Sequence, residues 1–359
     1  MLTLGLNISH DTTASVIDDG VVKNVYYEDR CRRKKYWHPT DSQSKLTCIE
    51  HYNLATVERV AFSSYDRRQF NLKFPDLSRD RVLQSKIIKD FSSEQLSLDR
   101  ILHLKDKYDF EIVYDLSQDN DIINSIKQQL ITDDIYFNKT QHHYHHAVCG
   151  TYFCPFDEAI VIVWDAGGSQ VYFDDWPSYR EVETIFHYKE NRIDPVYRKL
   201  NNRYFAKELE RNFKGFQDGC TACDQPLMKV IDGTLVEFTS FASSAQNFSE
   251  MTYALGLGDD GRHAGKLMGL ASYGRLMPDT QTMYTAANSV QTESFASSCR
   301  TIDTAINMIP ECKNIVLSGG YSLNCTNNYK YLSEYPDYNF FVDPIPHDGG
   351  TAIGAALAC

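Results

Sequence analysis

Short apolar runs separated by polar turns open the chain, and this alternation predicts β-structure. Asp19-Gly20 joins the second and third runs, and an Asp-Gly dipeptide between apolar runs is typical of a β-hairpin. The N-terminus is therefore expected to form a three-stranded meander. Its strands are predicted at residues 3–7, 14–17 and 21–27.

Helical and strand-like patterns alternate after this meander, which indicates a mixed α/β lobe over residues 1–140. The strands are predicted at 59–63 and 111–114. The helices are predicted at 42–51, 79–89, 96–107 and 120–130.

A second lobe is expected over residues 141–359, because 359 residues fit two units of about 100–200 residues. A helix over 141–153 precedes a buried strand over 159–164, and two further runs would complete a second meander. Helices then dominate to about Met308. The remaining strands are predicted at 171–173, 182–187, 314–317 and 339–342.

Two parts of the second lobe carry predictions of their own. Residues 174–236 are polar, aromatic and irregular, so we expect an insertion or lid there rather than core. The last helix, over 350–358, consists mainly of small residues and is expected to return to the first lobe.

The composition excludes two classes of protein. Hydrophobic residues make up 42 % and aromatic residues 13 %, which is enough for a large core and argues against wholesale disorder. The longest clear apolar run, 159–164, is strand-sized, so no membrane-spanning helix is expected. The first residues lack a basic region, which argues against a signal peptide and for a cytoplasmic protein.

The charge balance is acidic, at −12, which disfavours tight non-specific binding to a polyanion. The segment Arg30–Lys35 still holds five cations in six residues, and it is either a solvated loop or a phosphate-facing patch. The ten cysteines are expected to be reduced thiols. Cys220 and Cys223 form a Cys-x-x-Cys pair, but no further zinc ligands follow at matching spacing, so two packed thiols are favoured.

Four of the eleven histidines fall within residues 142–146. On a helix, His142 and His146 stand at i and i+4, so their rings share one face and can bind one metal ion. His143 and His145 point elsewhere. The alternative is a group of histidines at the solvent-exposed surface, but the i,i+4 pair favours a metal site. Two imidazoles completed by a carboxylate would suit iron, manganese or zinc.

Three aspartates, Asp11, Asp165 and Asp348, lie at or just beyond the end of an apolar strand. Ligands of α/β folds gather at the carboxyl ends of strands, so these carboxylates could converge with the histidines. Each one alone is also a common turn residue. The prediction therefore rests on all three together.

Glycine pairs follow three predicted strands, at residues 167–168, 319–320 and 349–350. Glycine lets backbone N–H groups approach phosphate oxygens closely, and a following helix N-terminus adds a favourable dipole. None of the pairs is a Walker A motif, yet three of them suggest a nucleotide cleft between two lobes. Lys266, beside Gly265, could meet a phosphate or carbonyl oxygen.

Taken together, these motifs resemble the carbamoyltransferase family of the nodulation and aminoglycoside-antibiotic enzymes. More distantly they resemble the Kae1/TsaD proteins of tRNA threonylcarbamoyladenosine synthesis. The motifs occur in the family's order across nearly the whole chain. The matching segments are Leu4-Gly5-Leu6-Asn7, His10-Asp11, Glu28-Asp29-Arg30 with Lys35, His142-His143-Tyr144-His145-His146-Ala147, Gly265-Lys266 with Met268-Gly269-Leu270-Ala271, Ser318-Gly319-Gly320 with Leu323-Asn324, and Asp348-Gly349-Gly350.

This resemblance implies an α/β fold of the ASKHA (actin/hexokinase-like) type, in which two ribonuclease-H-like lobes surround a nucleotide cleft. It implies a metal ion, usually iron, held by His142, His146 and Asp348. Asp165 would be a further ligand or would contact the transferred group.

The resemblance also implies a reaction: an acceptor hydroxyl attacks carbamoyl-adenylate, an ATP-derived donor, and AMP is released. His10 and Asp11 would lie beside the acceptor, and either could serve as its base. Lys35 and Lys266 would contact the nucleotide or the carbamoyl group. The nucleotide-binding residues are predicted to be Lys35, Gly167, Gly168, Lys266, Ser318, Gly319, Gly320 and Asn324.

Three departures limit what the resemblance carries over. The family usually continues into a YrdC-like domain that makes carbamoyl-adenylate, whereas this sequence ends at Cys359, so either a separate protein supplies the adenylate or the chain is a fragment. Ala264 replaces the family's glutamate. The spacing from Asp165 to Lys266 is longer than expected and that from Lys266 to Gly319 is shorter, so the acceptor-facing parts are expected to differ.

The leading interpretation is O-carbamoyl transfer to a sugar-like metabolite or to a hydroxymethyl group on a nucleotide, DNA or another nucleic acid. One alternative is threonylcarbamoyl transfer to tRNA, against which the acidic charge counts. Another is a non-catalytic nucleotide-binding partner, against which the retained metal set counts. No membrane partner is expected, and the identity of the metal and the oligomeric state, including a homodimer, stay open.

Overall fold

The computed structural model describes residues 1–35, 37, 46–63, 69–73, 111–115, 134–137, 141–173, 176–201, 227–239, 241–258, 263–274 and 283–359. The helices expected at 79–89, 96–107 and 120–130 lie outside these residues, as does the Cys220 and Cys223 pair. Among the described helices, none combines the length and the hydrophobicity that crossing a membrane requires.

The first sheet has the strand order β3-β2-β1-β4-β7. The predicted N-terminal meander forms its antiparallel half, while β1, β4 and β7 run parallel. Asp19 and Gly20 both have positive φ, which is the backbone that a tight hairpin turn requires. The strands are β1 (Leu2–Asn7), β2 (Thr13–Asp18), β3 (Val21–Tyr27), β4 (Arg59–Ser63) and β7 (Ile135–Phe137).

Several short elements surround this sheet. A separate two-stranded sheet pairs β5 (Gln69–Lys73) with β6 (Glu111–Asp115) in antiparallel fashion. The helix α1 (Glu28–Arg32) follows β3, and the 3-10 helices η1 (Cys48–His51) and η2 (Leu54–Thr56) precede β4.

The second sheet has the order β12-β13-β11-β10-β8-β14-β15, with β9 paired to β10. Its central strand β8 is antiparallel to β10 and parallel to β14, so β8 occupies the place that β1 has in the first sheet. The strands are β8 (Glu158–Trp164), β9 (Gln170–Phe173), β10 (Trp176–Lys189), β11 (Arg192–Asn201), β12 (Leu227–Ile231), β13 (Thr234–Thr239), β14 (Asn314–Ser318) and β15 (Asn339–Val342).

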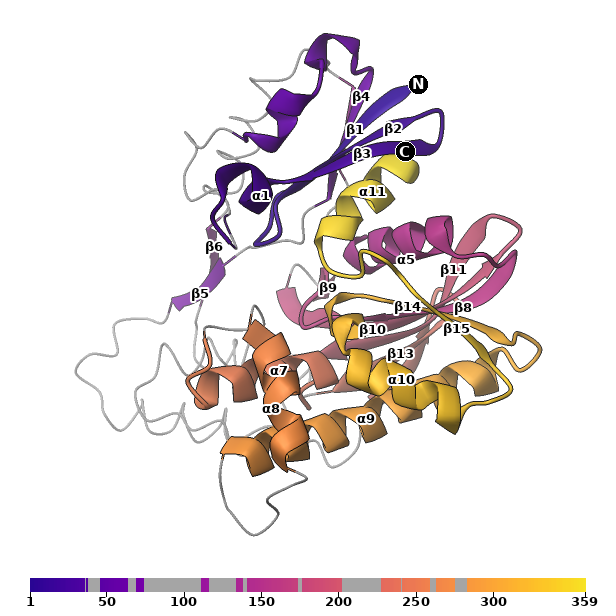
Figure 1. The fold of residues 1–359 in the computed structure, drawn as a ribbon. Coiled ribbons are helices and arrows are strands. Elements are labelled where there is room, and N and C mark those ends of the chain that lie inside the picture. Colours follow the sequence, from indigo (N-terminus) through magenta and orange to yellow (C-terminus); the bar gives the residue numbers. More distant parts are fainter. Residues whose placement is uncertain are drawn as a thin grey trace.

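The same five-strand arrangement therefore occurs twice: β3-β2-β1-β4-β7 in one lobe corresponds to β11-β10-β8-β14-β15 in the other. In each, three antiparallel strands are followed by two parallel ones, which is the ribonuclease-H-like order. The predicted ASKHA-type pair of lobes is confirmed, and Figure 1 shows the two sheets one above the other.

The described parts of residues 174–236 differ from the insertion or lid that we expected. They contribute β10 to β13, and Ile185 and Phe186 of β10 are buried on opposite faces of the sheet. The polar residues of this strand predict an exposed segment, but Glu181, Glu183 and Thr184 are buried.

Two helices fill the space between the sheets (Figure 1). The helix α5 (His142–Phe153) packs through Ala147 on Val161 and Val163 of β8, and α11 (Gly349–Leu357) packs through Ala355 against Ile17 and Ala61 of the first sheet. The outer face of the second sheet is covered by α7 (Ser244–Ala254), α8 (Ala264–Gly274), α9 (Met283–Met308) and α10 (Cys325–Glu334).

Glycines allow α11 to approach both of its neighbours at backbone distance. A Cβ atom at Gly354 would collide with the carbonyl oxygen of His145 in α5. A Cβ atom at Gly5 of β1 would collide with the carbonyl oxygen of Ala352 in α11. The first sheet, α11 and α5 are therefore held in one fixed spacing.

We predict that Gly354→Ala lowers the free energy of unfolding by about 1–3 kcal/mol, because the backbones of α5 and α11 must move apart to admit a methyl group. Gly269→Ala in α8 is the matched control, since nothing lies within 4 Å of its Cβ position. The control should raise stability by up to about 1 kcal/mol through helix propensity. Denaturant unfolding of both variants measures this, and equal stabilities would contradict the close packing.

Candidate metal centre

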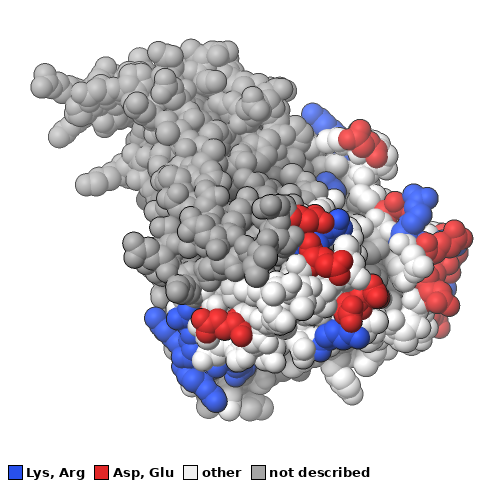
Figure 2. Space-filling view, turned by 90° about the horizontal axis from the view of Figure 1, so that it is seen from above, with Lys and Arg blue, Asp and Glu red and all other residues white. Residues whose placement is uncertain are grey.

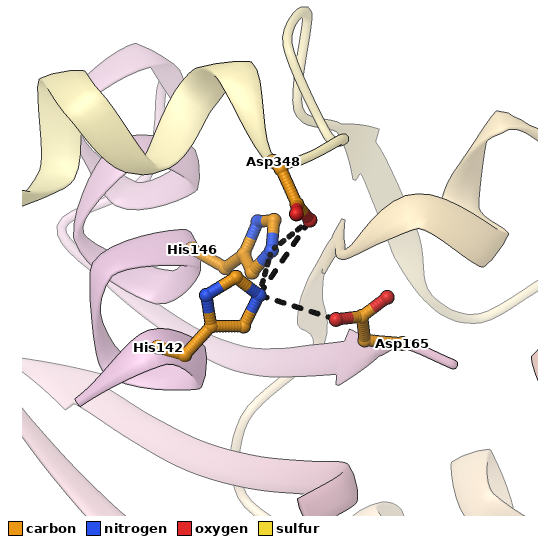
Figure 3. Close-up of side chains that lie close together, drawn as sticks. All are labelled: His142, His146, Asp165 and Asp348. Carbon is orange, nitrogen blue, oxygen red and sulfur yellow. Dashed lines mark hydrogen bonds and ion pairs between the residues drawn. The ribbon is translucent and has the colours of Figure 1, made fainter. Parts of the chain in front are cut away.

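Four side chains from three separate elements meet between the lobes (Figure 3). His142 and His146 lie one turn apart on α5, as their i,i+4 spacing requires. Asp165 directly follows β8, and Asp348 is the residue before the first turn of α11. The start of α5, the end of β8 and the start of α11 thus meet at one point.

The distances within this cluster are short. The Nε2 atom of His142 lies 3.2 Å from Nε2 of His146, 3.2 Å from Oδ2 of Asp165 and 3.6 Å from Oδ1 of Asp348. The Nε2 atom of His146 lies 3.8 Å from Oδ1 of Asp348. One ligand atom from each of the four residues falls within 4.8 Å of all the others.

The cluster is withdrawn from solvent. The exposed fractions are 1 % for His142, 0 % for His146, 8 % for Asp165 and 4 % for Asp348. Burying two carboxylates is costly unless positive charge accompanies them. The site therefore needs a proton or a cation.

The titration of the cluster reflects that need. Burial would lower the pKa of His142, but the adjacent carboxylates of Asp165 and Asp348 raise it to about 10. Burial would raise the pKa of both aspartates, yet the hydrogen bonds and charge of the histidines hold each of them below its usual range. The two carboxylates thus stay negative and attract a positive charge to the point that the imidazoles face.

These four residues fit a divalent metal ion. The two Nε2 atoms face each other at 3.2 Å, and two N–H groups cannot both point at that shared space, so at least one imidazole presents a lone pair there. Two imidazole nitrogens and two carboxylates suit iron, manganese or zinc, and their two negative charges would balance such an ion.

The other two histidines of the cluster in the sequence point away, as expected. The Nδ1 atom of His143 lies 2.7 Å from Oγ1 of Thr184 on β10. Burial lowers the pKa of His145 to about 3, so its ring is neutral. The first turn of α5 is held by a hydrogen bond of 3.0 Å from the backbone N–H of His142 to Oγ of Ser169.

The turn between β1 and β2 brings the first lobe to the same place. Nδ1 of His10 lies 3.7 Å from Oδ2 of Asp348, and Nε2 of His10 lies 3.4 Å from Oδ2 of Asp11. His347 also reaches Asp11, with its Nδ1 atom 3.1 Å from Oδ2. The His347 ring was missed in the sequence analysis, although its position beside Asp348 could have revealed it.

The glycine turns lie close to these residues. Gly319 has φ of +84°, and a Cβ atom there would collide with the carbonyl oxygen of Trp164. The Cβ position of Gly320 is 3.6 Å from Oδ1 of Asp165. At Gly168 a Cβ atom would strike the ring of His143, and at Gly167 it would strike the side chain of Arg180.

The polar residues predicted to bind nucleotide are engaged within the protein. The Ser318 hydroxyl is buried, 2.7 Å from Oδ2 of Asp343 and 3.2 Å from the carbonyl oxygen of His146. Asn324 caps α10 by accepting from the N–H of Asn327, and its Nδ2 donates to Oε1 of Gln291.

The two predicted lysines lie elsewhere on the described surface. Lys266 donates from Nζ to the carbonyl oxygen of Leu257 over 2.8 Å. Lys35 is exposed beyond the end of α1. A nucleotide-binding role for the glycines, Ser318, Asn324 and both lysines stays a prediction.

Comparison with known sequences points to one family. Residues 299–357, which include the Ser318 turn and Asp348, match the family model described as Carbamoyltransferase N-terminus. An uncharacterized protein of Synechocystis sp., sll1178, is 24 % identical over 367 residues, covering 97 % of this chain and 55 % of that protein. The chain thus spans about half the length of this curated relative. The family match supports a relationship to carbamoyltransferases.

Solved structures of low sequence identity are similar over nearly the whole chain. Component A of (R)-2-hydroxyglutaryl-CoA dehydratase from Acidaminococcus fermentans has a TM-score of 0.45 at 10 % identity, covering 100 % of this chain and 97 % of that one. Full-length HypF, bound to phosphate and nucleotide, has 0.47 at 12 %, covering 99 % and 54 %. A ROK hexokinase from Thermus thermophilus has 0.46 at 11 %, covering 100 % and 98 %.

We predict that His146→Ala abolishes metal binding and leaves the fold intact, because the remaining ligands lose one of the two imidazoles that face the shared point. Metal content after loading with iron, manganese or zinc and gel filtration measures the effect, and circular dichroism checks the fold. His187→Ala is the matched control, since His187 contacts Glu158, the first residue of β8, and does not contact the cluster. Stoichiometric metal in the His146 variant would contradict the assignment.

Proposed function

We propose that this protein is a metal-assisted O-carbamoyltransferase that moves a carbamoyl group from carbamoyl-adenylate to an acceptor hydroxyl. The observation that carries the proposal is the buried His142, His146, Asp165 and Asp348 cluster with His10 and Asp11 beside it. The match of residues 299–357 to a carbamoyltransferase family supports the type of group transferred.

A divalent metal held by this cluster would polarise the carbamoyl oxygen and stabilise the charge that develops on it. That help is needed because the carbamoyl nitrogen donates electrons into the carbonyl and makes it a poor electrophile. The donor set allows Fe²⁺, Mn²⁺ or Zn²⁺, with iron proposed first because the resemblance implies it.

The acceptor would approach from the first lobe. His10 is about one-third exposed, at 35 % of its side chain, whereas the four cluster residues are buried. We assign it as the base that removes the acceptor's proton, with Asp11 orienting its ring. The acceptor oxygen then bonds to the carbamoyl carbon, the bond from that carbon to the phosphate oxygen breaks, and AMP leaves.

The nucleotide half of the donor would be held by the turns that follow β8 and β14. Backbone N–H groups of Gly167, Gly319 and Gly320, with Lys35 and Lys266, are the groups proposed to contact its phosphate. The N–H of Gly168 donates to the carbonyl oxygen of Glu181, so Gly168 would contribute through its lack of a side chain. Asp165, a member of the cluster, also lies beside the Gly320 turn, so it would face the transferred group as well.

The donor itself is proposed to come from a YrdC-like domain or protein. The acceptor is proposed to be a sugar-like metabolite or a hydroxymethyl group of a nucleotide or nucleic acid. Figure 2 shows basic and acidic side chains in separate small groups over the described part of one face. The net charge of −12 counts against tight binding of a long polyanion.

The test supplies ATP and carbamoyl phosphate, with and without a YrdC-like protein, and a panel of hydroxylated sugars, hydroxymethylated nucleosides and DNA. Formation of a carbamoylated acceptor together with AMP is expected only with metal and a source of adenylate. Loss of turnover after chelation and its return on metal addition would support metal assistance. Threonylcarbamoyl transfer to tRNA would contradict the proposal. Nucleotide binding without any transfer by the metal-loaded protein would also contradict it.

We predict that His10→Ala lowers kcat for carbamoyl transfer by about 100- to 10,000-fold, because the acceptor hydroxyl loses its base. The metal content should stay at the wild-type level, since all four ligands remain. His51→Ala in the same lobe, whose ring stacks on Tyr26, should keep the wild-type rate. A wild-type rate for His10→Ala with loss of activity in Asp11→Asn would instead assign the base to Asp11.

A further inference from the structure

A further buried carboxylate adjoins the metal centre without belonging to its ligand set. Asp343 directly follows β15 and is 2 % exposed. Among the described residues no lysine or arginine pairs with it, and burial raises the pKa of its carboxyl group above the usual range. Burying such a group is costly unless hydrogen bonds satisfy its oxygens. The partners of Asp343 are therefore informative.

The bonds of Asp343 reach three separate segments. Its Oδ1 accepts from the backbone N–H of Ile345 over 2.8 Å and lies 3.8 Å from Sγ of Cys149 on α5. Its Oδ2 lies 2.7 Å from Oγ of Ser318 at the end of β14. That hydroxyl is in turn 3.2 Å from the carbonyl oxygen of His146.

Two of these three segments carry candidate metal ligands. Cys149 lies three residues after His146 on α5, and Ile345 lies in the short connection that runs from β15 to Asp348. Asp343 therefore joins the helix that holds both imidazoles to the loop that holds Asp348.

Close packing leaves this connection little room to shift. A Cβ atom at Gly350 would collide with the carbonyl oxygen of Ile345 and would lie 3.1 Å from Sγ of Cys149. The Cβ position of Gly150, in the middle of α5, is 3.6 Å from Oδ2 of Asp343. Glycine at position 350 therefore lets the start of α11 lie directly against this connection.

We infer that Asp343 is a positioning residue for the metal centre: its hydrogen bonds hold Asp348 at binding distance from His142 and His146. The inference rests on the proposed metal site and extends it beyond the ligands. Outer groups that orient ligands typically change metal affinity about 10- to 100-fold when they are removed. The Ile345 and Ser318 bonds predict an effect of that size here.

The test compares two substitutions of similar size. In Asp343→Asn the amide oxygen can accept from Ile345, and the amide N–H can donate to Ser318, whose hydroxyl then donates to His146. In Asp343→Leu the bonds to Ile345 and Ser318 are both lost, although the Ser318 hydroxyl can still donate to His146. Ser318→Ala is a milder variant that cuts only the link through the Ser318 hydroxyl to His146 and leaves the contact with Cys149 in place.

Thr301→Val is the matched control. It removes a buried hydrogen bond of 2.7 Å between Oγ1 of Thr301 on α9 and Oε2 of Glu183 on β10. That bond lies on the outer side of the second sheet, so its loss should lower thermal stability without changing metal affinity.

The measurement is the affinity of the metal-stripped protein for Zn²⁺, by competition with a chromophoric chelator, and the visible spectrum of its Co²⁺ form. Asp343→Leu should bind Zn²⁺ about 10- to 100-fold more weakly than wild type, with an altered Co²⁺ spectrum. The Zn²⁺ affinity of Ser318→Ala should lie between those of wild type and Asp343→Leu. The affinity of Asp343→Asn should stay within about threefold of wild type. Thermal unfolding in chelator separates these effects from loss of stability.

Three outcomes would count against these assignments, and they are distinguishable. Absence of Zn²⁺ and Co²⁺ binding by the wild-type protein would overturn the metal site and the proposed function with it. Wild-type affinity in both Asp343→Leu and Ser318→Ala would leave the metal site standing and overturn the positioning role. Equal weakening by Asp343→Asn and Asp343→Leu would overturn the hydrogen-bonded link.

Discussion

The backbone contacts of α11 with β1 and with α5 are the constraint on which the rest of this structure depends. Gly5 and Gly354 stand where any larger residue would strike a carbonyl oxygen of the neighbouring element. Because no side chain separates these backbones, the two helices between the sheets have a fixed spacing. The start of α11 then brings Asp348 to the face of α5 that carries His142 and His146 (Figure 3).

The convergence of these four side chains has an electrostatic cost. Two aspartates and two histidines share a buried volume, and the carboxylates hold their charge only because positive charge lies beside them. In the metal-free protein a proton on His142 supplies that charge, as the raised pKa of its ring indicates. A divalent ion would supply it more fully, which is the physical reason that we read the cluster as a metal centre.

Much of the candidate site could be predicted from local sequence. The i,i+4 spacing of His142 and His146 determines that they share a helix face, and the apolar run before Asp165 determines that this residue ends a strand. The contacts of Asp343 with Cys149 and of His347 with Asp11 could not be found in the same way, because these partners lie far away in the sequence. Asp11 is 336 residues from His347, and Cys149 is 194 residues from Asp343.

The sequence by itself determined many of the local elements, a meander in each lobe, and the residue types able to bind a metal. Its interpretation of residues 174–236 as an insertion or lid fails for β10 and β11, which belong to the second sheet; the buried Glu181 and Glu183 of β10 look like surface residues in the sequence. Only the tertiary structure decided that four ligands from α5, β8 and α11 converge, that Ser318 points inward to Asp343, and that His10 reaches Asp348 from the other lobe. The reason is that periodicity reports which face of its own element a residue occupies, whereas convergence depends on how closely separate backbones approach, and here glycines without side chains set that distance.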